Sequence, residues 1–149
     1  MILEPDFLDF VDLLNRHQVE YMVIGAHALA FYGHPRNTGD LDIWIKPSKE
    51  NASKVLDVLN EFGFGSLKLT EENFMKENYV TQLGYPPLRI DILNSISGVG
   101  FDDAYINQVE GIIDGVSIKF IGTKEFLANK RATGRPKDLG DIDEIQSGD

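Results

Sequence analysis

The stretch Val23-Ile24-Gly25-Ala26-His27-Ala28-Leu29, followed shortly by Arg36-Asn37-Thr38-Gly39-Asp40-Leu41-Asp42-Ile43, decides the fold. Residues 19–24 predict a strand buried on both faces, because apolar residues follow one another with little polar interruption. Gly25 ends this strand, and the Ala-rich residues up to Tyr32 favour a helix directly after it. Such a turn leaves backbone N–H groups at the helix start, where phosphate can bind. A glycine is expected there because a side chain would block the approach of phosphate to the backbone.

The second half of the stretch predicts a strand over residues 41–45 that carries two acids. Side chains two residues apart on a strand point to the same face, so Asp40 and Asp42 face the same way. Two neighbouring carboxylates repel each other unless they share a cation.

A third acid, Asp91, lies in the middle of the apolar strand predicted over residues 88–93. A buried carboxylate is costly without a partner, so Asp91 implies either a metal ion or an ion pair with a cation such as Arg89. Magnesium binds one or two carboxylates together with phosphate oxygens. The three acids therefore predict a Mg²⁺ site, with Mn²⁺ as the alternative ion.

The remaining periodicity predicts helices and strands that interleave along the chain. The expected helices cover residues 5–17, 48–62, 123–131 (capped by Thr123) and 136–145, and the expected strands cover 62–69, 79–83 and 88–93, with a hairpin over 111–121 that turns at Asp114-Gly115. We therefore expect a single α/β (α+β) domain over residues 1–149. Its central mixed sheet would have about four or five strands, with helices on one side and the acids along an open rim.

The composition is that of an ordinary globular protein without thiol chemistry. Of 149 residues, 42% are hydrophobic and 26% charged, and there is no cysteine, which excludes disulfides, thiolate metal sites and cysteine nucleophiles. The first residues lack the pattern of a signal peptide, and no apolar run is long enough to span a membrane, so we expect a cytoplasmic protein. The net charge of −10 disfavours non-specific binding to nucleic acid, although the cluster Lys130, Arg131, Arg135 and Lys137 could act locally.

Taken together, these residues resemble the DNA polymerase β-type nucleotidyltransferase superfamily, and above all its small prokaryotic members, the minimal and abortive-infection-type nucleotidyltransferases. In those proteins a glycine-rich turn precedes an Arg-x-Thr-x-Asp-φ-Asp segment, where φ is apolar, and residues 36–42 match it position for position. The segment from Lys130 to Asp141 resembles their closing motif. The resemblance spans about residues 20–142, and it rests on the ordered combination of these motifs.

The resemblance implies roles for the three acids and for the glycine turn. Asp40 and Asp42 would bind both metal ions, and Asp91 would bind the catalytic ion and help to deprotonate the acceptor hydroxyl. Gly25 and Ala26 would hold the triphosphate. Most of the superfamily has Gly-Ser at this turn, so Ala26 removes one hydroxyl contact to phosphate.

Four further residues are candidates for nucleotide binding, each with a structural alternative. Arg36 and Thr38 either contact substrate or brace their loop. Lys130 and Arg135 either bind phosphate or supply helix-end charge, with Asp138 as an ion-pair partner.

The function that follows is a Mg²⁺-dependent nucleotidyltransferase. It would move an NMP group from an NTP such as ATP to a hydroxyl of a protein, a small molecule or a tRNA. Two alternatives remain open: a nucleotide-binding or regulatory protein with little catalysis on the same fold, or one component of a toxin–antitoxin pair in which the enzyme modifies its partner or tRNA. A partner chain, or a second copy, could supply the part that larger members use to hold the base or acceptor.

Overall fold

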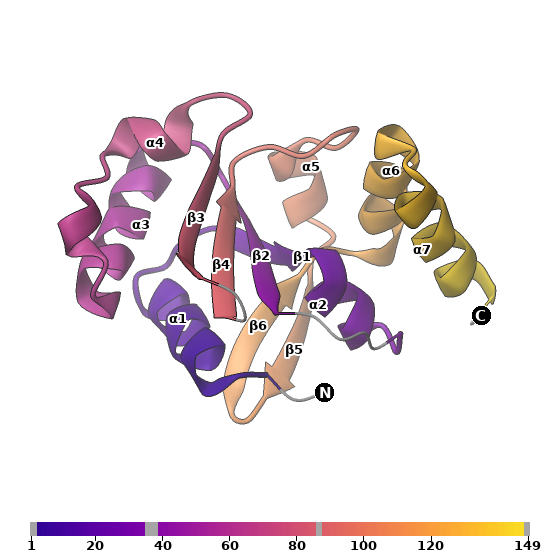
Figure 1. The fold of residues 1–149 in the computed structure, drawn as a ribbon, viewed down its shortest axis with the longest axis horizontal. Helices are drawn as coiled ribbons and strands as arrows, with labels where there is room; N and C mark the ends of the chain where they lie inside the picture. Colours follow the sequence, from indigo (N-terminus) through magenta and orange to yellow (C-terminus); the bar gives the residue numbers. More distant parts are fainter. Residues whose placement is uncertain (1–2, 35–38, 86–87, 148–149) are drawn as a thin grey trace.

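The computed structural model describes residues 3–34, 39–85 and 88–147, which form one mixed sheet with helices around it (Figure 1). The elements in chain order are α1 (Pro5–Arg16), β1 (Tyr21–Ile24), α2 (Gly25–Phe31), β2 (Asp40–Ile45), α3 (Lys49–Phe62), a 3₁₀ turn (Gly65–Leu67), α4 (Glu71–Met75), β3 (Val80–Tyr85), β4 (Leu88–Leu93), α5 (Phe101–Tyr105), β5 (Val109–Ile113), β6 (Val116–Phe120), α6 (Thr123–Thr133) and α7 (Pro136–Ser147).

The sheet has six strands in the order β3-β4-β2-β1-β6-β5. The central pairs β2–β4 and β1–β6 are parallel, and the pairs β1–β2, β3–β4 and β5–β6 are antiparallel. The strand count exceeds the expected four or five because both strands of the predicted hairpin join the sheet beside β1. All four residues of β1 are buried, as their apolar run predicts.

The two faces of the sheet differ in what covers them. The Tyr21 hydroxyl donates a hydrogen bond to Asn15 of α1 (2.9 Å), so α1 lies on the face to which Tyr21 points. Trp44 points the opposite way, because Tyr21 pairs with Ile45 and neighbouring strand residues alternate. Its ring packs edge-to-face on Phe101 of α5, with the ring centroids 5.1 Å apart. Helices therefore flank both faces, which corrects the expectation of helices on one side.

Two local predictions also need correction. Residues 62–69 do not form a strand: α3 ends at Gly63, which takes a left-handed conformation (φ 101°), and a 3₁₀ turn follows. The cap of α6 is Gly122, and Thr123 is the first helical residue, without a side-chain capping bond. The short helices α4 and α5 were not expected, since five residues carry too little periodicity to be recognised.

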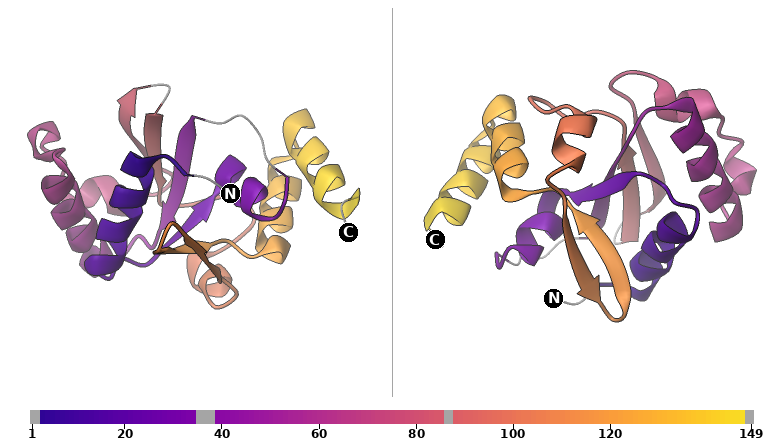
Figure 2. Two further views of the ribbon diagram at one scale, coloured as in Figure 1. Left: turned by 90° about the horizontal axis from the view of Figure 1, so that it is seen from below. Right: turned by 180° about the vertical axis from the view of Figure 1, so that it is seen from behind.

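The hairpin of α6 and α7 lies at the end of the molecule away from α3 and α4, and both further views agree with this placement (Figure 2). Left-handed Gly134 (φ 65°) ends α6, and Pro136 opens α7, as expected for a tight helix–helix connection. Within the described residues, every helix is too short or too polar to span a lipid bilayer.

Candidate active site

The glycine turn after β1 is built around a carboxylate. Gly25 has φ 68°, and a Cβ atom placed on it would lie 2.3 Å from Oδ2 of Asp42. The turn therefore needs glycine for two reasons: the left-handed backbone, and the close approach of the Asp42 side chain. Phosphate access, which the sequence suggested as the reason, stays a prediction. Ala26 follows as the second residue of α2.

The three predicted acids come together through the pairing of β2 with β4. Asp42 is the register partner of Asp91, and Asp40 is the partner of Arg89. Because paired residues of neighbouring strands project to the same side, the three carboxylates share one face of the sheet. This is the face of Trp44, whereas the apolar residues between the acids, such as Leu41 and Ile43, point to the core on the other side.

Arg89 holds two of these acids together. Its Nε donates to Oδ1 of Asp91 (2.8 Å), and its Nη2 donates both to Oδ2 of Asp91 (3.0 Å) and to Oδ2 of Asp40 (2.9 Å). The ion pair of Asp91 with Arg89 is therefore present, while metal binding by Asp91 stays a prediction. The bridge to Asp40 was missed, because the sequence shows only the spacing of Arg89 and Asp91 and not the register that brings Asp40 beside them.

The pKa of Asp42 is raised. Burial, followed by the charges of Asp91 and Asp40, raises its pKa from 3.8 to about 6, while Lys130 and Arg89 oppose the rise. Three carboxylates at one place thus leave excess negative charge that the nearby cations do not fully offset. This is the electrostatic condition under which a divalent ion binds well.

The donor set fits a hard divalent ion. Asp40, Asp42 and Asp91 supply only carboxylate oxygens, the ligands that Mg²⁺ and Mn²⁺ prefer. As the side chains stand, however, no group of three or more acidic, histidine or cysteine residues within the described chain is gathered tightly enough to hold one ion. The Arg89 bridge accounts for this, because it engages both oxygens of Asp91 and one of Asp40.

A cleft of about 470 Å³ opens in front of Asp42 and Asp91. Gly25 and Ile24 line it together with these acids, and Lys130, Thr133 and Arg135 of the α6–α7 hairpin line it as well and form its cationic wall. Its remaining lining is apolar or uncharged and comes from Asn78, Val80, Leu93, Ser95, Ile96, Ser97 and Asn129. The cleft thus brings acidic and basic side chains into one space, as binding of a metal–polyphosphate complex requires.

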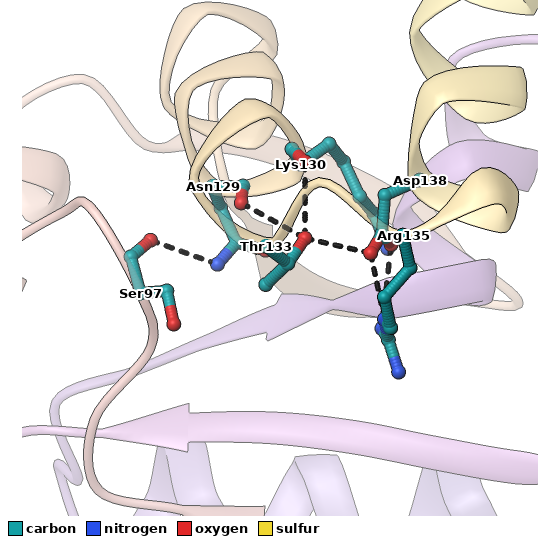
Figure 3. Close-up of polar contacts among 6 residues, drawn as sticks. All are labelled: Ser97, Asn129, Lys130, Thr133, Arg135 and Asp138. Carbon is teal, nitrogen blue, oxygen red and sulfur yellow. Dashed lines mark hydrogen bonds and ion pairs between the residues drawn. The ribbon is translucent and has the colours of Figure 1, made fainter.

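The cationic wall is organised by a buried carboxylate (Figure 3). Asp138 is fully buried and accepts hydrogen bonds from Lys130 Nζ (3.2 Å), Thr133 Oγ1 (2.7 Å) and Arg135 Nε (2.7 Å) and Nη2 (3.3 Å). These donors, Arg135 first, hold the pKa of Asp138 well below its ordinary value. Asn129 also donates to the carbonyl of Ser97 (3.0 Å), which ties the neighbouring loop to α6. The expected pairing of Asp138 with the basic cluster is confirmed.

Two further side chains, one on β2 and one on α2, are packed in the interior. Trp44 is 1% exposed and packs under Phe101, so it does not offer a stacking surface for a base. His27 is buried against the ring of Phe7 at 5.7 Å, as a packed histidine. Arg36 and Thr38 lie outside the described residues.

Comparison with known proteins identifies the family. A profile of the family described as "Nucleotidyl transferase of unknown function (DUF2204)" matches residues 5–148. The chain belongs to this nucleotidyltransferase family. A search of curated protein sequences gives no significant match.

Three solved structures share the fold of this nucleotidyltransferase. A lincosamide antibiotic adenylyltransferase bound to lincomycin has 14% identity and a TM-score of 0.58, and the alignment covers 98% of each chain. A candidate nucleotidyltransferase of Thermotoga maritima has 17% identity and a TM-score of 0.57, covering 99% of this chain and 92% of that one. A nucleotidyltransferase-like protein of Paracoccidioides brasiliensis has 19% identity and a TM-score of 0.55, covering 99% and 77%.

Proposed function

We propose that this family member is a divalent-metal-dependent nucleotidyltransferase that moves an NMP group from an NTP to a hydroxyl. The observation that carries the proposal is the pairing of Asp42 with Asp91, on one face with Asp40, at a cleft that Lys130 and Arg135 also line. Membership of the family supports nucleotide transfer in general.

The reaction is a displacement at the α-phosphorus. The acceptor oxygen forms a bond to this phosphorus while the bond to the β-phosphate oxygen breaks, and pyrophosphate leaves. The hydroxyl proton passes to a base, and Asp91 is the carboxylate that the family resemblance assigns to this task. Mg²⁺ or Mn²⁺ held by Asp40, Asp42 and Asp91 would supply Lewis-acid stabilisation of the phosphate oxygens.

Other residues would bind the phosphates of the nucleotide. Lys130 and Arg135 would balance the charge of the β- and γ-phosphates, because both line the same cleft as Asp42 and Asp91. Gly25 and Ala26 would offer backbone N–H groups to the triphosphate, which do not require the hydroxyl that Ala26 lacks. Arg36 and Thr38 stay candidates for substrate contact.

The acceptor proposed here is a small molecule or a protein side chain. The cleft is also lined by uncharged polar groups such as Asn78, Ser95 and Ser97, which suit a neutral hydroxyl compound. The net charge of −10 argues against a long nucleic acid. The lincosamide adenylyltransferase, which shares the fold, carries a bound antibiotic, so this fold accommodates small molecules.

The test is calorimetric titration of each NTP with and without Mg²⁺, followed by transfer assays in lysate. Wild-type protein is compared with Asp40→Asn/Asp42→Asn, and we expect metal-dependent binding only in the wild type. Label should move to an acceptor from [α-³²P]NTP and not from [γ-³²P]NTP, which separates nucleotidyl from phosphoryl transfer. If both Asp42→Asn and Asp91→Asn transferred label from [α-³²P]NTP as well as wild type does, the proposal would be refuted.

A binding or regulatory protein is the second candidate. Ala26, which lacks the serine hydroxyl, and the Arg89 bridge over the acids favour it. It predicts NTP binding without transfer of label. A toxin–antitoxin role predicts instead that expression of this chain alone arrests growth and that a neighbouring gene relieves the arrest.

A further inference from the structure

The Arg89 guanidinium lies on the carboxylate oxygens that a metal ion would use. It engages both oxygens of Asp91 and one oxygen of Asp40, all within 3.0 Å. Asp42, the third acid of the cluster, packs against the Gly25 turn. One cation is thus set directly among three acids.

The sheet fixes Arg89 in this place. Its Cα is the register partner of Asp40, and it precedes Asp91 by two residues on β4, so all three side chains emerge on one face. The side chain of Arg89 is 26% exposed and that of Asp91 only 11%. Water therefore screens this contact less than an ordinary surface ion pair, and the planar guanidinium suits two-oxygen binding of a carboxylate.

We propose that Arg89 is an internal counter-ion that keeps the acid cluster from binding a bare divalent ion tightly, so that the ion binds well only together with the nucleotide. This inference rests on the proposed function, because it presumes that Asp40, Asp42 and Asp91 are the metal ligands. Arg89 acts through those acids and is a positioning residue.

The physical basis is competition followed by linkage. An ion that takes an oxygen of Asp91 or Asp40 must displace or weaken a charge-assisted hydrogen bond and must approach a fixed positive charge. A triphosphate reverses the balance, since its oxygens complete the coordination of the ion and its negative charge attracts the guanidinium. Nucleotide and metal should therefore raise each other's affinity by the same factor, and Arg89 should enlarge that factor.

The experiment measures Mn²⁺ binding by electron paramagnetic resonance, with and without a non-hydrolysable NTP analogue. The proteins are wild type, Arg89→Met, Arg89→Lys and Arg16→Met. Arg16 pairs with Asp12 on the surface of α1, so Arg16→Met is a control that removes the same charge far from the cleft. Arg89→Lys keeps the charge but cannot form the two-oxygen bridge.

We expect Arg89→Met to bind Mn²⁺ alone about tenfold or more tightly than wild type, as loss of a charge-assisted bond to a competing cation predicts. The nucleotide should then improve Mn²⁺ affinity by a correspondingly smaller factor. Arg89→Lys should lie between the two, and Arg16→Met should match wild type. In EDTA, Arg89→Met should melt at a lower temperature than wild type, and Mn²⁺ should restore much of the difference.

Two results overturn the inference in different ways. If wild type binds Mn²⁺ and Arg89→Met binds it equally or more weakly, Arg89 only orients Asp91, and the counter-ion role fails while the proposed function stands. If no protein binds Mn²⁺ with or without nucleotide, the metal site and the proposed function fail together. Should Arg89→Met not fold in EDTA, Arg89→Lys decides by the same comparison, with weaker Mn²⁺ binding than wild type as the refuting result.

Discussion

Replacing Asp42 by asparagine should stabilise the metal-free protein. Burial and the charges of Asp91 and Asp40 raise the pKa of Asp42 from 3.8 to about 6, so ionised Asp42 disfavours the folded state. At about 1.4 kcal/mol per pKa unit, this penalty amounts to about 2–3 kcal/mol at pH 8. Asparagine has nearly the same shape and never ionises, so Asp42→Asn should avoid the penalty.

The sign and the pH window follow from the raised pKa. A group with a raised folded-state pKa stabilises the fold below its unfolded pKa, and this contribution is lost as the pH rises through the folded pKa. The advantage of Asp42→Asn should therefore be below about 1 kcal/mol at pH 4, roughly half developed at pH 5 and complete above pH 7. Urea unfolding of both proteins in EDTA at these pH values measures this stability advantage directly.

The matched control is Asp57→Asn, which removes an exposed acid of α3 on the far side of the molecule and should change stability by less than about 0.5 kcal/mol. Saturating Mg²⁺ and NTP should reverse the order of Asp42→Asn and wild type, because only wild type gains the full free energy of ligand binding. The reasoning would be refuted if Asp42→Asn were less stable than wild type at pH 8 in EDTA. It would also be refuted if the difference in unfolding free energy between the two proteins were the same at pH 4 and pH 8.

Three further predictions concern the turn, the cationic wall and the tryptophan. Gly25→Ala should lower the free energy of unfolding by at least about 1–2 kcal/mol for the left-handed backbone, and the clash with Asp42 should add to this cost. Calorimetric melting should show a clearly lower Tm, and an unchanged Tm would contradict the close approach of Asp42 to Gly25. Asp138→Asn should lower the free energy of unfolding by about 3–5 kcal/mol in urea at pH 7, since it leaves Lys130 beside an uncharged partner. A loss below about 1 kcal/mol would show that the hydrogen bonds to Asp138 contribute little to stability. Trp44 is the single tryptophan and is buried, so Mg²⁺ and NTP should leave its fluorescence maximum unchanged, whereas a shift would mean that it meets the nucleotide.

Short-range patterns in the sequence predicted much of the local structure. Ser48, the first residue of the helix predicted over 48–62, caps α3 by accepting a hydrogen bond from Asn51 N (3.2 Å). The hairpin turns at Asp114-Gly115 between β5 and β6, as expected for these turn residues. These features depend on neighbours along the chain, and residue type alone specifies them.

The strand spacing of two also placed Asp40 and Asp42 on one face before any tertiary contact was known. The same reasoning found Asp91 as the acid inside an apolar strand. The roles of Asp40, Asp42 and Asp91 as metal ligands stay a prediction, as do those of Arg36 and Thr38 toward the substrate. The family resemblance that the motifs suggested is confirmed by the family profile.

What the sequence by itself determined is therefore which residues carry charge and which face of each strand they occupy, because both follow from residue type and backbone geometry. Only the tertiary structure decided that Asp91 stands beside Asp42 and that Arg89 bridges Asp91 to Asp40. The physical reason is that the register of β2 against β4 is set by packing between segments far apart in the chain. The charge balance of the site follows from that register.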